Sequence, residues 1–217
     1  MRKYNGDEVK NCYNLTAQQY AEGFLHELDG KPFDRNILDR FAALLPAGST
    51  IYDFGCGSGQ TTKYLADKKL HHLVGLDFCE NAIALARVHF PEIEFIVDDM
   101  LASKMPSASA DGIIAFYAVV HFTYTEIEQV LNEWLRLLKI GGYCLFCFHV
   151  GDEAAPVSDF LGVKGANATW QLLDTDKVLD IVKKVGFKVT EAVVRYPYIG
   201  VEHESRRAYI LLQKKSR

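Results

Sequence analysis

Three glycines stand at alternate positions where a short apolar run ends and a helical pattern begins. The run covers residues 51–54, and the glycines are Gly55, Gly57 and Gly59. Because glycine has no Cβ, such a turn permits positive φ angles and lets a ligand approach the backbone closely. The following helix would offer free N–H groups to an anionic group. The turn is therefore a candidate ligand-binding loop, and a purely structural turn is the alternative.

Asp77 follows twenty residues after Gly57 and is expected at the end of the second strand. A carboxylate in that position can accept hydrogen bonds from the vicinal hydroxyls of a ribose. The glycine turn and this acid together indicate a nucleoside cofactor. A dinucleotide fingerprint needs its third glycine three places after the second, where this chain has Gln60. A pyrophosphate-binding turn is thus disfavoured.

Two histidines are candidate catalytic bases. His121 is expected just past the fourth strand and His149 at the end of the fifth, and ligands of open α/β sheets bind at the carboxyl ends of strands. Imidazole can accept a proton near neutral pH, which would help an O–H or N–H acceptor to react. Alternatively, His121 caps a helix or contacts the cofactor, and His149 is a strand-end residue without a chemical role.

Metal and thiol chemistry are not indicated. Cys144 and Cys147 have the spacing of a redox pair, but an offset of three on a strand directs the two thiols to opposite faces. No group of cysteines and histidines has the spacing of metal ligands. We therefore expect no metal site.

From residue 50 onward the pattern alternates between strands and helices. This alternation predicts an α/β fold with a doubly wound, mainly parallel sheet. The expected strands are 50–54, 70–76, 93–97, 112–118, 143–149, 187–195 and 207–212, and the expected helices are 60–68, 80–90, 125–138 and 175–185, with Thr125 and Thr175 as caps.

Residues 1–46 read as two amphipathic helices, the first capped by Thr16 and the second beginning near Asp34. We expect one domain over 1–217, in which 1–46 form an N-terminal helical cap and 47–217 a Rossmann-like core. The segment 151–170 has no sustained period, so we expect an irregular loop that is either a lid or a surface excursion.

The composition describes a globular protein of 217 residues with 49% apolar residues and a net charge of −4. This acidic balance disfavours nucleic acid as a partner. The longest apolar run, 113–120, is far shorter than the ~20 residues of a membrane helix, and no secretory signal is visible. Five cysteines are too few for a disulfide scaffold. We expect a cytoplasmic monomer or homodimer without membrane contact.

The run from Asp53 to Gly59 resembles the first motif of the class I S-adenosylmethionine-dependent methyltransferases, Asp/Glu-x-Gly-x-Gly-x-Gly. Residues 75–78, 97–100, 111–117 and 138–142 are similar to later motifs of that family. The resemblance implies a seven-stranded sheet with an antiparallel last strand, a Rossmann-like core and S-adenosylmethionine as the cofactor, with S-adenosylhomocysteine as its product.

The resemblance also implies which residues bind the cofactor. It places Asp77 at the ribose, and it places Phe78, Asp99 and Met100 around the adenine. The remaining implied contacts come from the glycine turn, the end of the fourth strand and the N-terminal helix: Asp53, Gly55, Cys56, Gly57, Gly59, Ala115, Phe116 and Tyr20. Tyr13 and Tyr20 would share one helical face over the cofactor, and packing onto the core is the alternative.

We therefore predict a methyltransferase that methylates oxygen or nitrogen of a small molecule. Other segments resemble small bacterial methyltransferases and do not name the acceptor. Trp170, Arg195, Tyr196 and Tyr198 are candidates for lining an acceptor pocket. The alternatives are a nicotinamide-dependent oxidoreductase on a related fold and a protein that binds S-adenosylmethionine without turnover.

Overall fold

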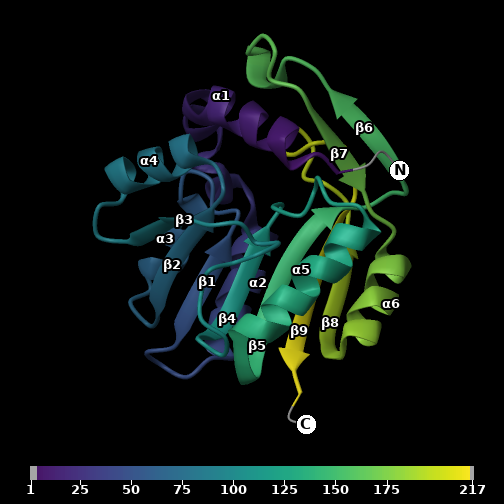
Figure 1. Cartoon of the computed structure of the whole chain (residues 1–217). Coiled ribbons are helices and arrows are strands. Elements are labelled where there is room, and N and C mark those ends of the chain that lie inside the picture. The colour runs from purple at the N-terminus through teal and green to yellow at the C-terminus, as the bar shows by residue number, and fades with distance from the viewer. Residues whose placement is uncertain (1–3, 216–217) are drawn as a thin grey trace.

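The computed structural model describes residues 4–215, and a seven-stranded sheet forms its centre. The strands are β1 (Thr50–Phe54), β2 (His72–Asp77), β3 (Glu94–Val97), β4 (Ala110–Phe116), β5 (Leu138–His149), β8 (Phe187–Arg195) and β9 (Arg207–Lys214). They lie in the order β3-β2-β1-β4-β5-β9-β8, and β9 runs antiparallel to both of its neighbours (Figure 1). The predicted doubly wound sheet with an antiparallel last strand is confirmed.

The order of the strands reverses at β1, which pairs in parallel with β2 on one side and with β4 on the other. In open α/β sheets the crevice for ligands lies beyond the carboxyl ends of the strands at such a switch point. The glycine turn after β1 and the segment after β4 both leave the sheet here. The topology thus brings the predicted site residues to one end of the sheet.

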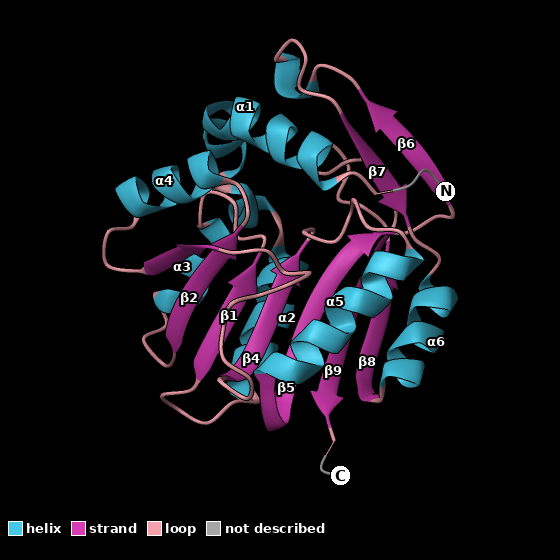
Figure 2. Ribbon diagram, in the orientation of Figure 1, coloured by secondary structure: helices cyan, strands magenta, loops and turns pink. Residues whose placement is uncertain are grey.

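Helices cover both faces of the sheet. Figure 2 shows α5 (Tyr124–Leu137) and α6 (Thr175–Val185) in front, and α2 (Pro32–Ala43) and α3 (Gln60–Ala66) behind. Their apolar sides form two large clusters with alternate residues of the strands. On β5, Cys144 belongs to one cluster and Cys147 to the other, which confirms that the two thiols face opposite ways. A further helix, α4 (Glu80–His89), packs on Phe95 of β3.

Helix α1 (Gly6–Phe24) and a second, two-stranded sheet lie across the carboxyl ends of the strands (Figure 1). The small sheet is a hairpin of β6 (Glu153–Val157) and β7 (Ala168–Leu172), and a short helix, η2 (Phe160–Gly162), stands between its strands. The prediction of an irregular loop over 151–170 is wrong. Pro156 and the many small polar residues hid the hairpin, because a two-stranded sheet tolerates proline along an open edge.

Three predicted helix starts are also wrong. The helices are capped by Asn5, Thr123 and Asp174 rather than by Thr16, Thr125 and Thr175. Thr16 lies inside α1, where its hydroxyl donates to the carbonyl of Cys12 one turn earlier. Within the described residues, no helix is long and apolar enough to cross a membrane. The division into a cap and a core stays a prediction, and residues 1–3 and 216–217 of it lie outside the described range.

Candidate functional site

The glycine turn has the left-handed backbone that its composition suggested. Gly55, Gly57 and Gly59 have φ angles of +67°, +55° and +90°. A Cβ on Gly55 would lie 2.3 Å from the Cβ of Ala118, and one on Gly59 would lie 2.8 Å from the ring of Phe95. Gly57 has more room, since the nearest atom to its added Cβ is 3.5 Å away. Two of the three glycines are therefore needed for packing, and Gly57 is free to face a ligand.

Asp77 joins the end of β2 to this turn. One of its carboxylate oxygens accepts the N–H of Gly57 at 2.9 Å, and the other accepts the N–H of Cys79 at 2.8 Å. The side chain is buried, and burial raises the pKa of Asp77 although these hydrogen bonds oppose the shift. Each oxygen retains a lone pair, so the carboxylate can accept further hydrogen bonds from a bound polyol.

A cavity of about 820 Å³, counting the open space at its mouth, lies between the glycine turn, α1 and the segment after β4. It brings together nine of the predicted site residues. These are Tyr20, Gly55, Gly57, Asp77, Phe78, Asp99, Met100, Phe116 and His121.

Five predicted residues do not line the cavity: Asp53, Cys56, Gly59, Ala115 and His149. Asp53 is buried behind the turn, where Thr62 Oγ1 donates to it at 2.6 Å. Burial raises the pKa of Asp53 to about 7. Cys56 and Ala115 are buried among apolar neighbours. In this structure these side chains support the turn and the strands around the cavity.

His121, which also lines the cavity, contacts α1 and β7. Its Nδ1 lies 2.8 Å from the carbonyl oxygen of Thr169, so Nδ1 carries the proton and donates it. Its Nε2 then accepts the hydroxyl of Tyr13 at 3.0 Å. Burial lowers the pKa of His121 to about 4, and the ring is neutral at physiological pH. Tyr13 also lines the cavity and packs edge-on against Tyr20.

His149 lies outside the cavity, in a separate stack of rings. It stacks between Tyr117 and Trp170, with ring centroids 5.3 and 6.1 Å away, and its Nδ1 lies 2.6 Å from Ser205 Oγ. Burial, assisted by the charge of Arg207, lowers the pKa of His149 to about 3. The structure thus separates the two histidines that the sequence paired as candidate bases.

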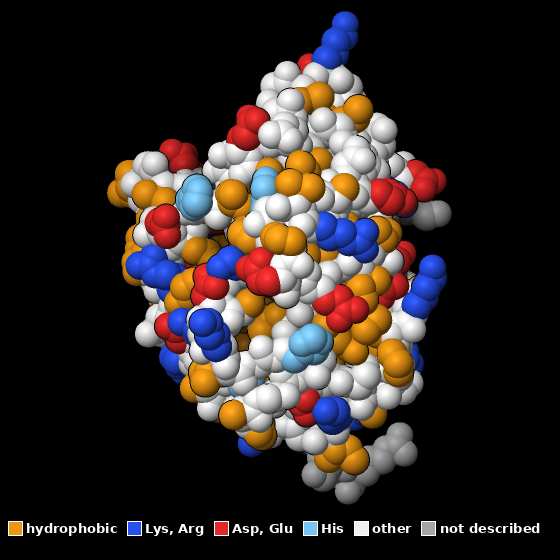
Figure 3. Space-filling model, turned by 90° about the vertical axis from the view of Figure 1, so that its left-hand side faces the viewer, with side chains coloured by type: hydrophobic (Ala, Val, Ile, Leu, Met, Phe, Trp, Pro, Cys, Tyr) orange, Lys and Arg blue, Asp and Glu red, His pale blue; other side chains and the backbone are white. Residues whose placement is uncertain are grey.

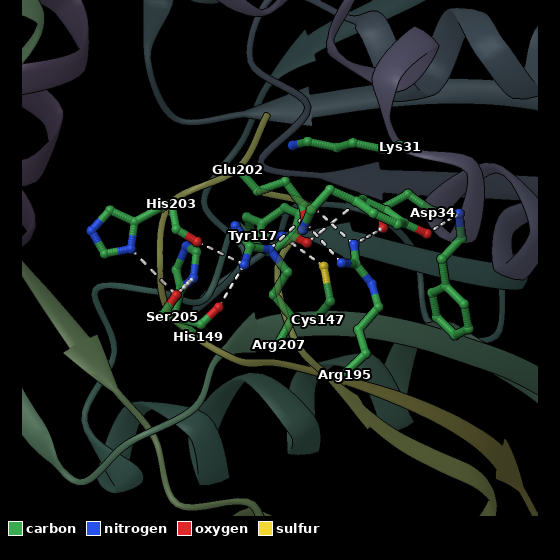
Figure 4. A network of polar contacts seen from close by, with 12 residues as sticks. Lys31, Asp34, Tyr117, Cys147, His149, Arg195, Glu202, His203, Ser205 and Arg207 are labelled. Atoms are coloured by element: carbon green, nitrogen blue, oxygen red, sulfur yellow. Dashed lines mark hydrogen bonds and ion pairs between the residues drawn. The ribbon is translucent and has the colours of Figure 1, made fainter. Parts of the chain in front are cut away.

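A buried polar network lies beside this stack (Figure 4). Arg195 donates to Asp34 at 2.9 Å and to both carboxylate oxygens of Glu202 at 2.7 Å. Tyr209 connects Asp34 to the hydroxyl of Tyr117, which lines the cavity. Arg195 is therefore occupied by partners within the protein. Of the other candidates for an acceptor pocket, Trp170 and Tyr198 do not line the cavity, and Tyr196 is 77% exposed.

Tyr4 and Phe122 line the cavity without belonging to any motif. Tyr117, the last residue of the motif over 111–117, also lines the cavity. Tyr117 adopts a φ of +53° directly after β4, a conformation that is rare for a bulky residue. Such backbone strain concentrates at functional sites, but no residue pattern announces it.

Residues 51–142 match the model of the methyltransferase domain family. These residues hold β1 to β4, the glycine turn, Asp77 and His121. The matched segment, which is less than half of the chain, is similar to methyltransferase domains. It contains most of the cavity lining, and the remaining lining residues are Tyr4 and residues of α1.

Two curated relatives of this chain are named for different acceptors. The tRNA (carboxymethyluridine(34)-5-O)-methyltransferase ALKBH8 of Mus musculus is 35% identical over 63% of this chain and 19% of its own length. Phosphoethanolamine N-methyltransferase 3 of Arabidopsis thaliana is 31% identical over 56% of this chain and 27% of its own length. The chain thus matches less than a third of the length of either relative.

A solved structure extends the likeness over most of this chain. Phosphoethanolamine N-methyltransferase 2 of Haemonchus contortus, in complex with phosphomonomethylethanolamine and S-adenosylhomocysteine, superposes with a TM-score of 0.71. The match covers 94% of this chain and 59% of that one, at 18% identity. At this identity the likeness shows the fold alone.

Proposed function

We propose that this chain transfers a methyl group from S-adenosylmethionine to oxygen or nitrogen of a small molecule. The observation that carries the proposal is one cavity that is lined both by Asp77 with the glycine turn and by the Tyr13–His121 pair. The carboxylate and the turn suit a ribose, and the pair suits an acceptor that loses a proton.

The lining fits S-adenosylmethionine better than a dinucleotide. Asp77, Asp98 and Asp99 are the only charged side chains among the lining residues, and no Lys or Arg within 4–215 joins them. A cationic sulfonium is compatible with this acidic lining, whereas a pyrophosphate would lie among carboxylates without a cation. In the proposed complex Asp77 binds the ribose, Phe78, Asp99 and Met100 surround the adenine, and Gly55, Gly57 and Phe116 border the methionine portion. Tyr20 covers the cofactor from α1.

The bound cofactor supplies an already activated methyl group, so the protein mainly has to align the acceptor with it. His121 is neutral and held by Thr169, and its Nε2 is ready to take a proton. The acceptor's proton passes to the oxygen of Tyr13 while the Tyr13 hydroxyl proton passes to His121. Burial raises the pKa of Tyr13, so its phenol stays protonated between turnovers.

The proton route predicts a loss of turnover in His121→Ala and Tyr13→Phe. General base catalysis contributes about 10²–10⁴-fold, so kcat should fall by that factor while the affinity for S-adenosylhomocysteine changes little. Because the pKa of His121 is about 4, its titration should leave the wild-type rate flat between pH 5.5 and 8. The measurement is transfer of labelled methyl from S-adenosylmethionine to a metabolite pool. Unchanged turnover in both variants would remove this pair from the mechanism.

Two observations favour a small acceptor over a nucleic acid. The cavity lining lacks the cations that bind phosphates, as described above. Seen from the side of β3 and α4, the described surface mixes acidic, basic and hydrophobic side chains without a large basic patch (Figure 3). A nucleic-acid enzyme usually presents such a patch.

We further propose that the protein is cytoplasmic, because all five cysteines are free thiols, as expected in a reducing compartment. We also propose that it is a monomer or homodimer. The alternatives differ in cofactor or in turnover. An oxidoreductase would be stabilised against heat by NAD⁺ more than by S-adenosylhomocysteine. A non-catalytic binding protein would bind S-adenosylhomocysteine and transfer no methyl group to any pool.

A further inference from the structure

The lining of the cavity combines carboxylates with aromatic rings. Asp77, Asp98 and Asp99 are its charged lining residues, and no Lys or Arg among the described residues joins them. The aromatic lining includes Tyr13, which contacts His121, and the rings of Tyr117 and Phe122. Because His121 is neutral, an acceptor in this cavity meets carboxylates, aromatic rings and uncharged groups, and no lining cation.

Two cations close to the lining residue Tyr117 and its network already have acidic partners. Lys31 has its Nζ 5.2 Å from the centre of the Tyr117 ring, but it pairs with Glu27, and its side chain is only 10% exposed. Arg195 is held by Asp34 and Glu202. To bind a phosphate or carboxylate of an acceptor, either cation would have to give up an ion pair with a carboxylate that is at most 16% exposed, which is costly.

The aromatic rings that line the cavity contact further rings outside it. Tyr13 packs edge-on against Phe160, and Phe160 packs against Trp170, with centroids 5.9 Å apart in both pairs. Trp170 stacks on His149, which stacks on Tyr117. Aromatic side chains from α1, η2, β7, β5 and the end of β4 thus form a continuous arc. An apolar wall of this kind binds the flat, apolar body of a small molecule.

We propose that the acceptor is an aromatic compound with a hydroxyl group, and that acceptors bearing phosphate are rejected. This inference rests on the proposed function. In the reaction the hydroxyl oxygen forms a bond to the methyl carbon as the carbon–sulfur bond breaks. The electron pair of that bond stays on sulfur, which becomes the neutral thioether of S-adenosylhomocysteine. The hydroxyl proton passes through Tyr13 to His121.

The test uses the full chain saturated with S-adenosylhomocysteine and compares the binding of 2-naphthol, catechol and phosphoethanolamine by calorimetry. We expect at least one of the two phenols to bind at least tenfold more tightly than phosphoethanolamine. Phe122→Ala removes a lining ring that the proposed complex does not assign to the cofactor, and it should weaken binding of that phenol about tenfold. The matched control Tyr196→Ala removes an exposed ring away from the cavity and should leave it unchanged.

The outcomes separate the two proposals. If S-adenosylhomocysteine itself does not bind, the proposed function fails. If it binds but neither phenol does, or if phosphoethanolamine binds as tightly as the phenols, the proposed acceptor class is wrong while the cofactor site stands. The same conclusion follows if Tyr196→Ala weakens phenol binding as much as Phe122→Ala.

Discussion

At the scale of single residues, the two candidate histidines have different surroundings but share a lowered pKa. His121 accepts a hydrogen bond from Tyr13 at the cavity, whereas His149 is enclosed by rings and by Ser205. The sequence placed both at carboxyl ends of strands, which is correct. It could not show that β7 brings a carbonyl onto His121, because that contact joins residues 48 positions apart.

His149 makes the stability of the fold depend on pH. Its folded pKa of about 3 lies below its unfolded value of about 6.5, so its contribution is present above pH 6.5 and is lost as the pH falls. His149→Phe keeps a ring in the stack and removes this titration. Between pH 7 and 5 the variant should lose up to about 2 kcal/mol less stability than the wild type. Urea unfolding at both pH values measures this, and equal losses would contradict the burial of a neutral imidazole.

At the scale of elements, the glycine turn was predictable because its spacing is set by the backbone that it must adopt. The hairpin of β6 and β7 was not predictable, because it depends on contacts with residues that are far away in the sequence. Gln171, for example, donates its backbone N–H to the carbonyl of Val120, beside His121. Such contacts fix the hairpin although its own sequence has a weak strand pattern.

The turn predicts different costs for two glycine substitutions. Gly59→Ala combines a φ of +90° with a Cβ 2.8 Å from the Phe95 ring, and it should cost about 2–4 kcal/mol of stability. Gly141→Ala is the matched control, since Gly141 has a φ of +82° but nothing within 4 Å of the added Cβ, and it should cost only about 1–2 kcal/mol. Denaturant unfolding of both variants gives the comparison. Equal costs would show that the Phe95 contact does not constrain the turn.

At the scale of the whole molecule, one buried ionic network joins parts that are far apart in the chain. Asp34 begins α2, Arg195 ends β8, and Glu202 lies in the segment before β9. The alternation of strands and helices predicted the sheet because local pattern decides each element. It could not predict this network, since its four charged residues, Asp34, Arg195, Glu202 and Arg207, come from separate segments and meet only in the fold.

Removing Arg195 from this network should destabilise the whole fold. Arg195→Ala removes the ion-pair partner of Asp34 and leaves Glu202 with Arg207 alone, and because the two carboxylates are 1% and 0% exposed it should cost about 3–5 kcal/mol. Arg40→Ala breaks an exposed pair with Glu191 and should cost less than about 1 kcal/mol. Thermal and denaturant unfolding would measure both changes. A small effect of Arg195→Ala would mean that the two carboxylates find other partners.

The cofactor site underlies both proposals, and calorimetric titration with S-adenosylhomocysteine tests it most directly. The expected result is saturable binding of one ligand per chain, lost or weakened at least a hundredfold in Asp77→Ala, because that variant removes the ribose acceptor and the partner of the Gly57 N–H. The control Asp180→Asn, in an exposed ion pair on α6, should bind like the wild type. Absence of binding to the wild type, or equal affinity in Asp77→Ala, would contradict the account.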